Sequence, residues 1–186
     1  MPMPLIKLDN AGKKYLEKKF TLEINKSDFI LVSGENGNGK TTLIQLVLGF
    51  IHPDFGLVES KKLKIGYLPE KAMLPLFIKV LPYLETLARI KKGKIDNELI
   101  LAFNIPIFKS IHELSKGNQQ KLAIISTFLG NPDLIILDEP LSGLDLESTL
   151  VLKKWIEKKK GEGMSFMIST HQPDLFKDMA SLHISL

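Results

Sequence analysis

Residues 29–42 read FILVSGENGNGKTT, in which a short apolar run leads directly into a glycine-rich loop. Gly34, Gly39, Lys40 and Thr41 occupy the fixed positions of the phosphate-loop pattern G-x-x-x-x-G-K-[ST]. Glycines let consecutive backbone N–H groups point inward around a polyphosphate, and a helix that starts at the loop adds its positive end. The stretch therefore predicts a buried strand, a phosphate-binding loop and a helix. A glycine-rich turn that binds nothing is the alternative, and the strand-like and helical stretches on either side count against it.

The loop residues are candidate ligands of a nucleotide and its metal ion. We expect the ammonium of Lys40 to neutralise β- and γ-phosphate oxygens. The hydroxyl of Thr41 is a hard oxygen, the type of ligand that Mg²⁺ prefers. The residues expected to surround the phosphates are Gly34, Glu35, Asn36, Gly37, Asn38, Gly39, Lys40, Thr41 and Thr42.

A second apolar run, LIIL at residues 134–137, is followed by Asp138, Glu139 and Pro140. Open α/β sheets bind ligands at the carboxyl ends of their strands, so we expect this carboxylate pair to face the phosphate loop. Asp138 suits the outer coordination shell of Mg²⁺, and Glu139 suits a base that orients and polarises an attacking water. Alone, the pair would be a solvated loop. Together with the phosphate loop it indicates a nucleotide-hydrolysing site.

The rest of the chain alternates strand and helix patterns, which predicts an α/β fold. Strands are expected at residues 20–24, 29–32, 64–68, 134–137, 164–168 and 182–186, and helices after residue 40 and at 80–90, 115–129 and 146–160. Residues 71–112 hold helix signals and no strand signal, so they predict a helical insertion. In the last helix we expect Leu146, Leu150, Trp155 and Ile156 to face the core.

The length and amino-acid composition of the chain are typical of one globular domain. The 186 residues include 44% hydrophobic and 25% charged residues, with a net charge of +4. Cysteine is absent, which excludes disulfides, thiolate metal ligands and cysteine nucleophiles. No apolar run approaches the roughly 18 residues that span a bilayer, and no secretory signal is visible, as expected in the cytosol. The positive charge permits contact with anionic lipid or nucleic acid, but scattered surface lysines explain it better, so we expect no nucleic-acid partner.

Residues 114–121 read LSKGNQQK and lie between the phosphate loop and the carboxylate pair. They resemble the signature motif of ATP-binding cassette (ABC) proteins, usually LSGGQ, in its LSKGN form. Other family motifs follow the same order. Asp145 stands where the D-loop lies, His171 where the switch histidine lies, and Tyr15 where an aromatic ring stacks on adenine. The resemblance covers residues 7–184.

This resemblance implies one ABC nucleotide-binding domain over residues 1–186. Its expected architecture is a P-loop NTPase (RecA-like) core with a small antiparallel β subdomain and an α-helical subdomain inserted at about residues 71–130. Members hydrolyse ATP with Mg²⁺, and two copies enclose two ATP molecules head to tail, as a homodimer or with a related cassette. The resemblance assigns a role at the ATP of the facing subunit to Ser115, Gly117, Asn118 and Gln119.

Several of these residues have simpler alternatives. Ser115 and Asp145 each precede a helix pattern and suit N-caps, and we expect the cap and the family role together. Tyr15 could be a half-buried aromatic of a strand, and His171 an ordinary histidine. By resemblance, the catalytic residues would be Lys40, Glu70, Glu139 and His171.

Glu70 departs from the family, which normally has glutamine after a strand such as residues 65–69, IGYLP. A carboxylate still offers oxygens to Mg²⁺ or to water, so Thr41, Asp138 and Glu70 are the expected metal ligands. The GYLPE form resembles the subfamily that energises ABC-2-type exporters. The connection at residues 56–65 is very short for the family, and the chain reads as a minimal cassette.

The resemblance implies an ATPase subunit that powers a membrane transporter, with export favoured. Its partner would be a separate transmembrane permease subunit, which would hold it at the cytoplasmic face of the membrane. The helical insertion would dock the permease through apolar residues that could equally pack inside the subdomain: Met73, Leu74, Leu76, Phe77 and Ile78.

Two other functions stay open. A soluble ABC-type ATPase acting on ribosomes or DNA usually carries two cassettes, long coiled coils or zinc cysteines, which this sequence lacks. A hydrolysis-deficient regulatory cassette is favoured only by Glu70. The presence of Lys40, Asp138, Glu139 and His171 argues against it.

Overall fold

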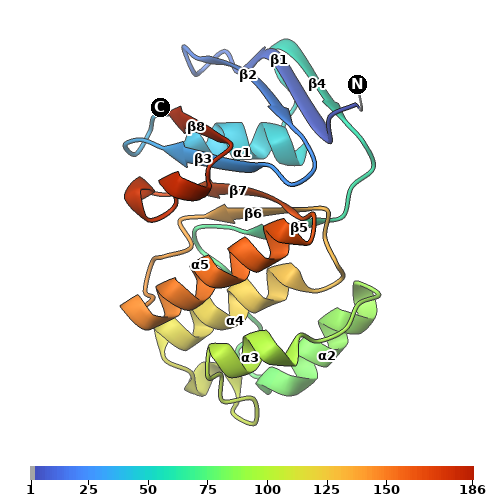
Figure 1. The fold of residues 1–186 in the computed structure, drawn as a ribbon, viewed down its shortest axis with the longest axis vertical. Helices are drawn as coiled ribbons and strands as arrows, with labels where there is room; N and C mark the ends of the chain where they lie inside the picture. Colours follow the sequence, from blue (N-terminus) through green and yellow to red (C-terminus); the bar gives the residue numbers. More distant parts are fainter. Residues whose placement is uncertain (1–2) are drawn as a thin grey trace.

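A parallel sheet forms the central layer of the computed structural model, which describes residues 3–186 (Figure 1). Its strand order is β5-β6-β7-β3-β8. The strands are β3 (Phe29–Ser33), β5 (Ile65–Leu68), β6 (Leu134–Asp138), β7 (Ser165–Ser169) and β8 (Leu182–Ser185). Every residue of β3, β6 and β7 is buried, because both faces of the sheet are covered. Each of these strands therefore carries at least three consecutive apolar residues.

One face of this sheet is covered by helix α1 (Lys40–Leu48), beyond which lies a second, antiparallel sheet (Figure 1). The second sheet has the order β2-β1-β4, with β1 (Ile6–Gly12), β2 (Lys19–Ile24) and β4 (Phe55–Ser60). Alternate residues of the central strands, such as Ile30 and Val32, join this core with the buried face of α1. The predicted small antiparallel β subdomain is confirmed.

The other face of the parallel sheet packs against α4 (Lys116–Phe128) and α5 (Leu146–Gly161). Helices α2 (Val80–Ile90) and α3 (Asn97–Ala102) lie beyond them (Figure 1). Phe29 and Leu31 of β3 enter this second core, which continues into α2 and α3. Short 3₁₀ turns occupy Ile111–Glu113, Pro173–Leu175 and Lys177–Met179. None of the helices within residues 3–186 has the length and apolar character needed to cross a bilayer.

The predicted α/β class and its main elements are confirmed, with three differences. Strands β1 and β4 lay outside the predicted set, and β4 is exposed or half-buried throughout, so it carries no apolar alternation. The predicted inward face of α5 is wrong at Leu146 and Leu150, which are 72% and 47% exposed. The positions that turn inward are Ser148, Thr149, Leu152, Trp155 and Ile156, and at 3.6 residues per turn Leu146 and Leu150 lie away from that face.

Candidate functional site

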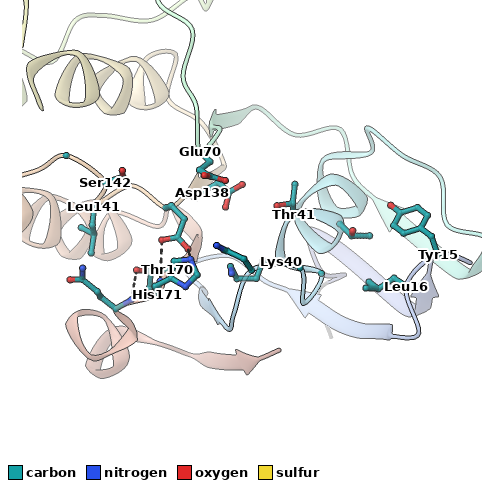
Figure 2. Close-up of a pocket in the computed structure, with 17 residues that line it drawn as sticks. Tyr15, Leu16, Lys40, Thr41, Glu70, Asp138, Leu141, Ser142, Thr170 and His171 are labelled. Atoms are coloured by element: carbon teal, nitrogen blue, oxygen red, sulfur yellow. Dashed lines mark hydrogen bonds and ion pairs between the residues drawn. The ribbon is translucent and has the colours of Figure 1, made fainter. Parts of the chain in front are cut away.

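A cleft of about 600 Å³ opens at the carboxyl ends of the central strands (Figure 2). Segments that follow β3, β6 and β7 line it, as expected for an open α/β sheet. It brings together Tyr15, Asn36, Gly37, Gly39, Lys40, Thr41, Thr42, Glu70, Asp138, Glu139 and His171. Gly34, Glu35 and Asn38 border a neighbouring hollow together with His171. The expected signature and D-loop residues line neither: Ser115, Gly117, Asn118, Gln119 and Asp145.

The phosphate loop is shaped by glycines in left-handed conformations. Gly37 and Gly39 have φ angles of +84° and +98°, which residues with a side chain rarely adopt. Gly39 is the N-cap of α1 and has no side chain to satisfy the first N–H groups of the helix. The first N–H groups of α1 lie at the cleft, where an anion can accept hydrogen bonds from them.

Lys40 is the buried cation of this loop, with its side chain folded back over it. The residue is only 7% exposed, and its Nζ donates to the carbonyl oxygens of Gly34 at 2.7 Å and Glu35 at 3.1 Å. Figure 2 shows Lys40 in the same cleft as Glu70, Asp138 and Thr41. Phosphate oxygens entering the loop can replace the two carbonyls as stronger, charged acceptors.

Asp138 is the last residue of β6 and is buried. The hydroxyl of Ser169 donates a hydrogen bond to its Oδ1. Burial raises the pKa of Asp138 above its ordinary value, and the neighbouring charge of Glu70 adds to the rise. The Ser169 hydroxyl and the Lys40 ammonium act in the opposite direction. Figure 2 shows the Glu70 carboxylate beside that of Asp138, so a divalent cation here would relieve the repulsion between them.

Glu139 is held by contacts with the end of β7 and with the residues that follow it. Its backbone N–H donates to the carbonyl and the hydroxyl of Ser169, at 3.1 and 3.2 Å. Its side chain turns to His171, whose backbone N–H donates to Oε2 at 3.2 Å and whose Nε2 lies 3.1 Å from Oε1. The backbone of Glu139 is in the left-handed region, with φ at 49°. A carboxylate and an imidazole thus face each other at the edge of the cleft.

The donor set of the cleft fits Mg²⁺ bound together with a nucleotide. Thr41, Asp138 and Glu70 contribute hydroxyl and carboxylate oxygens to the same cleft. Within residues 3–186, no group of three or more His, Asp or Glu side chains is arranged to hold a metal by itself. Mg²⁺ is usually held by one or two carboxylates with waters and substrate phosphates, which matches such a partial set.

Both predicted helix caps are confirmed. Ser115 is the N-cap of α4, and its Oγ accepts from the Asn118 backbone N–H at 3.2 Å. Asp145 is the N-cap of α5, and its Oδ1 accepts from the Ser148 N–H at 2.7 Å. Tyr15 lies in a turn between β1 and β2 and is 68% exposed, so the alternative of a half-buried strand residue is wrong.

Sequence reasoning missed the Ser169 hydroxyl, which bonds to both members of the carboxylate pair. A serine that ends a buried strand, after the apolar residues Phe166, Met167 and Ile168, was the available signal, since a buried hydroxyl needs partners. It also missed the cleft positions after the carboxylates, at Leu141, Ser142 and Gly143. Their placement depends on the turn that follows Glu139.

Comparison with known proteins decides the family. The model of the family described as ABC transporter matches residues 18–142. An uncharacterized ABC transporter ATP-binding protein of Methanocaldococcus jannaschii is 39% identical over 181 residues, which cover 91% of this chain and 69% of that protein. The chain belongs to the ABC transporter family. The predicted family is confirmed, and the chain is an ABC transporter ATPase.

Other relatives of this ABC ATPase give the same result. An uncharacterized ABC transporter ATP-binding protein of Bacillus subtilis is 35% identical over 195 residues, and the chain spans 65% of its length. The zinc import ATP-binding protein ZnuC of Rickettsia prowazekii is 36% identical over 180 residues, which cover 91% of this chain and 77% of that protein.

Solved structures confirm the ABC fold. A metal-chelate type ABC transporter in an inward-facing conformation matches with a TM-score of 0.82 at 25% identity, over 98% of this chain and 80% of that chain. A dimeric ATP-binding cassette in a post-hydrolysis state, bound to ADP and Pi, matches with a TM-score of 0.79 at 22% identity, over 97% and 94% of the two chains. The second match carries the fold alone.

Proposed function

We propose that this ABC ATPase binds and hydrolyses Mg-ATP in a head-to-tail dimer and thereby powers a membrane transporter. One observation carries the proposal. The phosphate loop, the carboxylate pair and His171 share one cleft, whereas Ser115 and Gly117 lie outside it at the start of α4. A signature helix outside its own cleft is suited to the nucleotide of a second subunit. Such a symmetric contact closes at two copies.

In this proposal, the cleft residues divide the work of hydrolysis. Lys40 exchanges its two carbonyl partners for phosphate oxygens and stabilises their charge as the terminal phosphoryl leaves. Glu139 accepts a hydrogen bond from the attacking water and aligns it, while His171 holds the carboxylate and reaches the γ-phosphate. Mg²⁺, held by Thr41, Asp138 and Glu70, would supply positive charge on the phosphates.

In the proposed dimer, the signature helix of the facing subunit would complete each ATP site. Ser115, Gly117, Asn118 and Gln119 would face the phosphates of the neighbouring ATP, with Asp145 of the D-loop close to the same interface. Tyr15 would stack on the adenine of its own ATP, since its ring is exposed at the rim of the cleft.

We propose that the helical subdomain, about residues 71–130 of one nucleotide-binding domain, docks a transmembrane permease subunit. Met73 and Phe77 are 97% and 88% exposed, and Leu76 and Ile78 are also exposed, whereas Leu74 packs against the core. Four of the five candidate docking residues are therefore free for a partner. Phe108, 77% exposed, lies on the segment that pairs with them through the Lys79–Ser110 bridge. The subunit would sit at the cytoplasmic face of the membrane and need no nucleic acid.

The direction of transport is open to two proposals. Residues 66–70, GYLPE, favour the ABC-2-type exporters by resemblance. Among the relatives described above, the one whose name states a cargo is a zinc importer, and a similar solved structure is of metal-chelate type. Uptake of a metal ion therefore has the better support. Radioactive zinc uptake by vesicles holding this subunit and its permease distinguishes the two.

The central test traps the dimer. Glu139→Gln keeps the shape of the side chain but removes the carboxylate that polarises water, so bound ATP should persist. We expect this variant to be a monomer without ligand and a dimer with Mg-ATP, measured by size-exclusion chromatography with light scattering. Adding Ser115→Arg should abolish the dimer by filling the second phosphate site.

A monomeric Glu139→Gln protein at tens of micromolar calls for one further measurement, reconstitution with the permease subunit. If ATP still fails to bring two cassettes together there, the head-to-tail mechanism is wrong for this protein. A dimer that survives Ser115→Arg would refute the role of the signature helix.

A further inference from the structure

The start of the signature helix is tied to the loop that carries Glu139. Gln120, half-buried on the first turns of α4, donates from Nε2 to the carbonyl oxygen of Pro140 at 3.1 Å. Pro140 is buried and directly follows Glu139 in the chain. The amide of Gln120 therefore satisfies a backbone carbonyl that the fold has largely removed from water.

Two further contacts bring the same pair of segments together. Lys121 Nζ lies 3.8 Å from Asp145 Oδ2, at the other end of the loop that begins with Pro140. Gly117 approaches the loop so closely that an added Cβ would lie 2.9 Å from the carbonyl oxygen of Gly143. Residues 140–145 thus follow the surface of α4 from Gly117 to Lys121.

The opposite side of this loop faces the cleft. Leu141, Ser142 and Gly143 line the cleft, and Figure 2 shows Leu141 and Ser142 on the side of Thr170 and His171. The loop is therefore a short bridge, with the proposed ATP cleft on one side and the signature helix on the other.

We propose that Gln120 is a positioning residue that couples Glu139 to the signature helix of the same subunit. This rests on the proposed head-to-tail dimer. In such a dimer, Glu139 serves the ATP of its own cleft while Ser115 serves the ATP of the facing cleft. A loop held by Gln120 makes the position of Ser115 depend on the state of Glu139. Loss of the γ-phosphate in one cleft then loosens the signature contact in the other.

Three substitutions separate the hydrogen bond from packing. Gln120→Met keeps nearly the same size but removes the donor. Gln120→Glu keeps the length and places a carboxylate oxygen against the Pro140 carbonyl, which should repel it. Gln120→Lys supplies a donor again. Gln45→Met on α1, another half-buried glutamine, is the matched control.

The variants are placed in the Glu139→Gln background, and two quantities are measured with the whole chain. The first is the affinity of the monomer for Mg-ATP, from a titration with a fluorescent ATP analogue at low protein concentration. The second is the dissociation constant of the ATP-bound dimer, from sedimentation velocity over a protein concentration series. We expect unchanged ATP affinity for every variant, because the phosphate loop is untouched.

We expect the dissociation constant of the ATP-bound dimer to change in the Gln120 variants. Loss of one neutral hydrogen bond in each subunit should weaken dimerisation about fivefold to 140-fold for Gln120→Met. Gln120→Glu should weaken it further, and Gln120→Lys should recover part of the loss. A residue that only supports the fold would lower ATP affinity and the melting temperature together and would not be rescued by lysine.

Equal dimer constants for Gln120→Met, Gln120→Glu and the control would overturn the inference, as would parallel losses of ATP affinity and dimer strength. Failure of the parent Glu139→Gln protein to dimerise, with the permease present, is a different result. It removes the proposed dimer itself, and the coupling through Gln120 falls with it.

Discussion

Replacing Lys40 by alanine tests the assignment of the phosphate loop most directly. The ammonium donates to two carbonyl oxygens, and nucleotide binding would exchange both for phosphate oxygens. A hydrogen bond between two charged groups contributes about 1.5–3 kcal/mol, and we set against it about 1 kcal/mol for each bond that the ammonium gives up to an uncharged carbonyl. Two such exchanges make a net loss of roughly 1–4 kcal/mol in the alanine variant, or about 5-fold to 700-fold in the dissociation constant.

Equilibrium titration with a fluorescent ATP analogue in the presence of Mg²⁺ measures this loss, and phosphate release measures the accompanying fall in turnover. Lys62→Ala, at an exposed lysine between β4 and β5, is the matched control and should change neither quantity. Thermal unfolding confirms that the variant folds. An Lys40→Ala protein that folds, binds Mg-ATP within about threefold of the parent and hydrolyses it normally would refute the reasoning.

Two other substitutions test the proposed roles of Tyr15 and Glu70. Tyr15→Ala should weaken ATP binding by about 1–2 kcal/mol, the scale of one base–aromatic stack, while Tyr15→Phe keeps the ring and should bind normally. An unchanged dissociation constant for the alanine variant would return Tyr15 to a surface role. Glu70→Gln should retain substantial steady-state ATPase activity, because the amide oxygen can still serve Mg²⁺ or water. Complete inactivation would show that the negative charge of Glu70 is itself required.

The sequence predicts best those elements whose side chains all meet the same environment. Strands β3 and β6 are covered on both faces, so each carries four consecutive apolar residues and the pattern is visible without the fold. The phosphate loop is equally visible, because its glycines and lysine serve chemistry at fixed spacing. Strand β4 is the opposite case, since it pairs with β1 through its backbone while its side chains stay largely in solvent.

Contacts between distant segments could not be predicted in the same way. The bond from Gln120 to Pro140 depends on how α4 packs beside the loop after β6. Helix α5 begins at Leu146 as predicted, but its inward face is set by how the helix packs on the sheet, which leaves Leu146 and Leu150 in solvent. Local patterns give the type of an element, whereas its rotation and neighbours are set by the whole fold.

The left-handed backbone at Glu139 bears on how this protein can change over evolutionary time. A side chain in that conformation costs about 1–2 kcal/mol, which glycine avoids and asparagine reduces. Selection for stability alone would therefore replace the carboxylate by a smaller residue. A lineage freed from the need to turn over ATP would become more stable as it lost its enzyme, so decay toward a silent nucleotide-binding protein is thermodynamically downhill. If Glu139 has the role in hydrolysis proposed above, continuous use of the reaction is what keeps glutamate at this position.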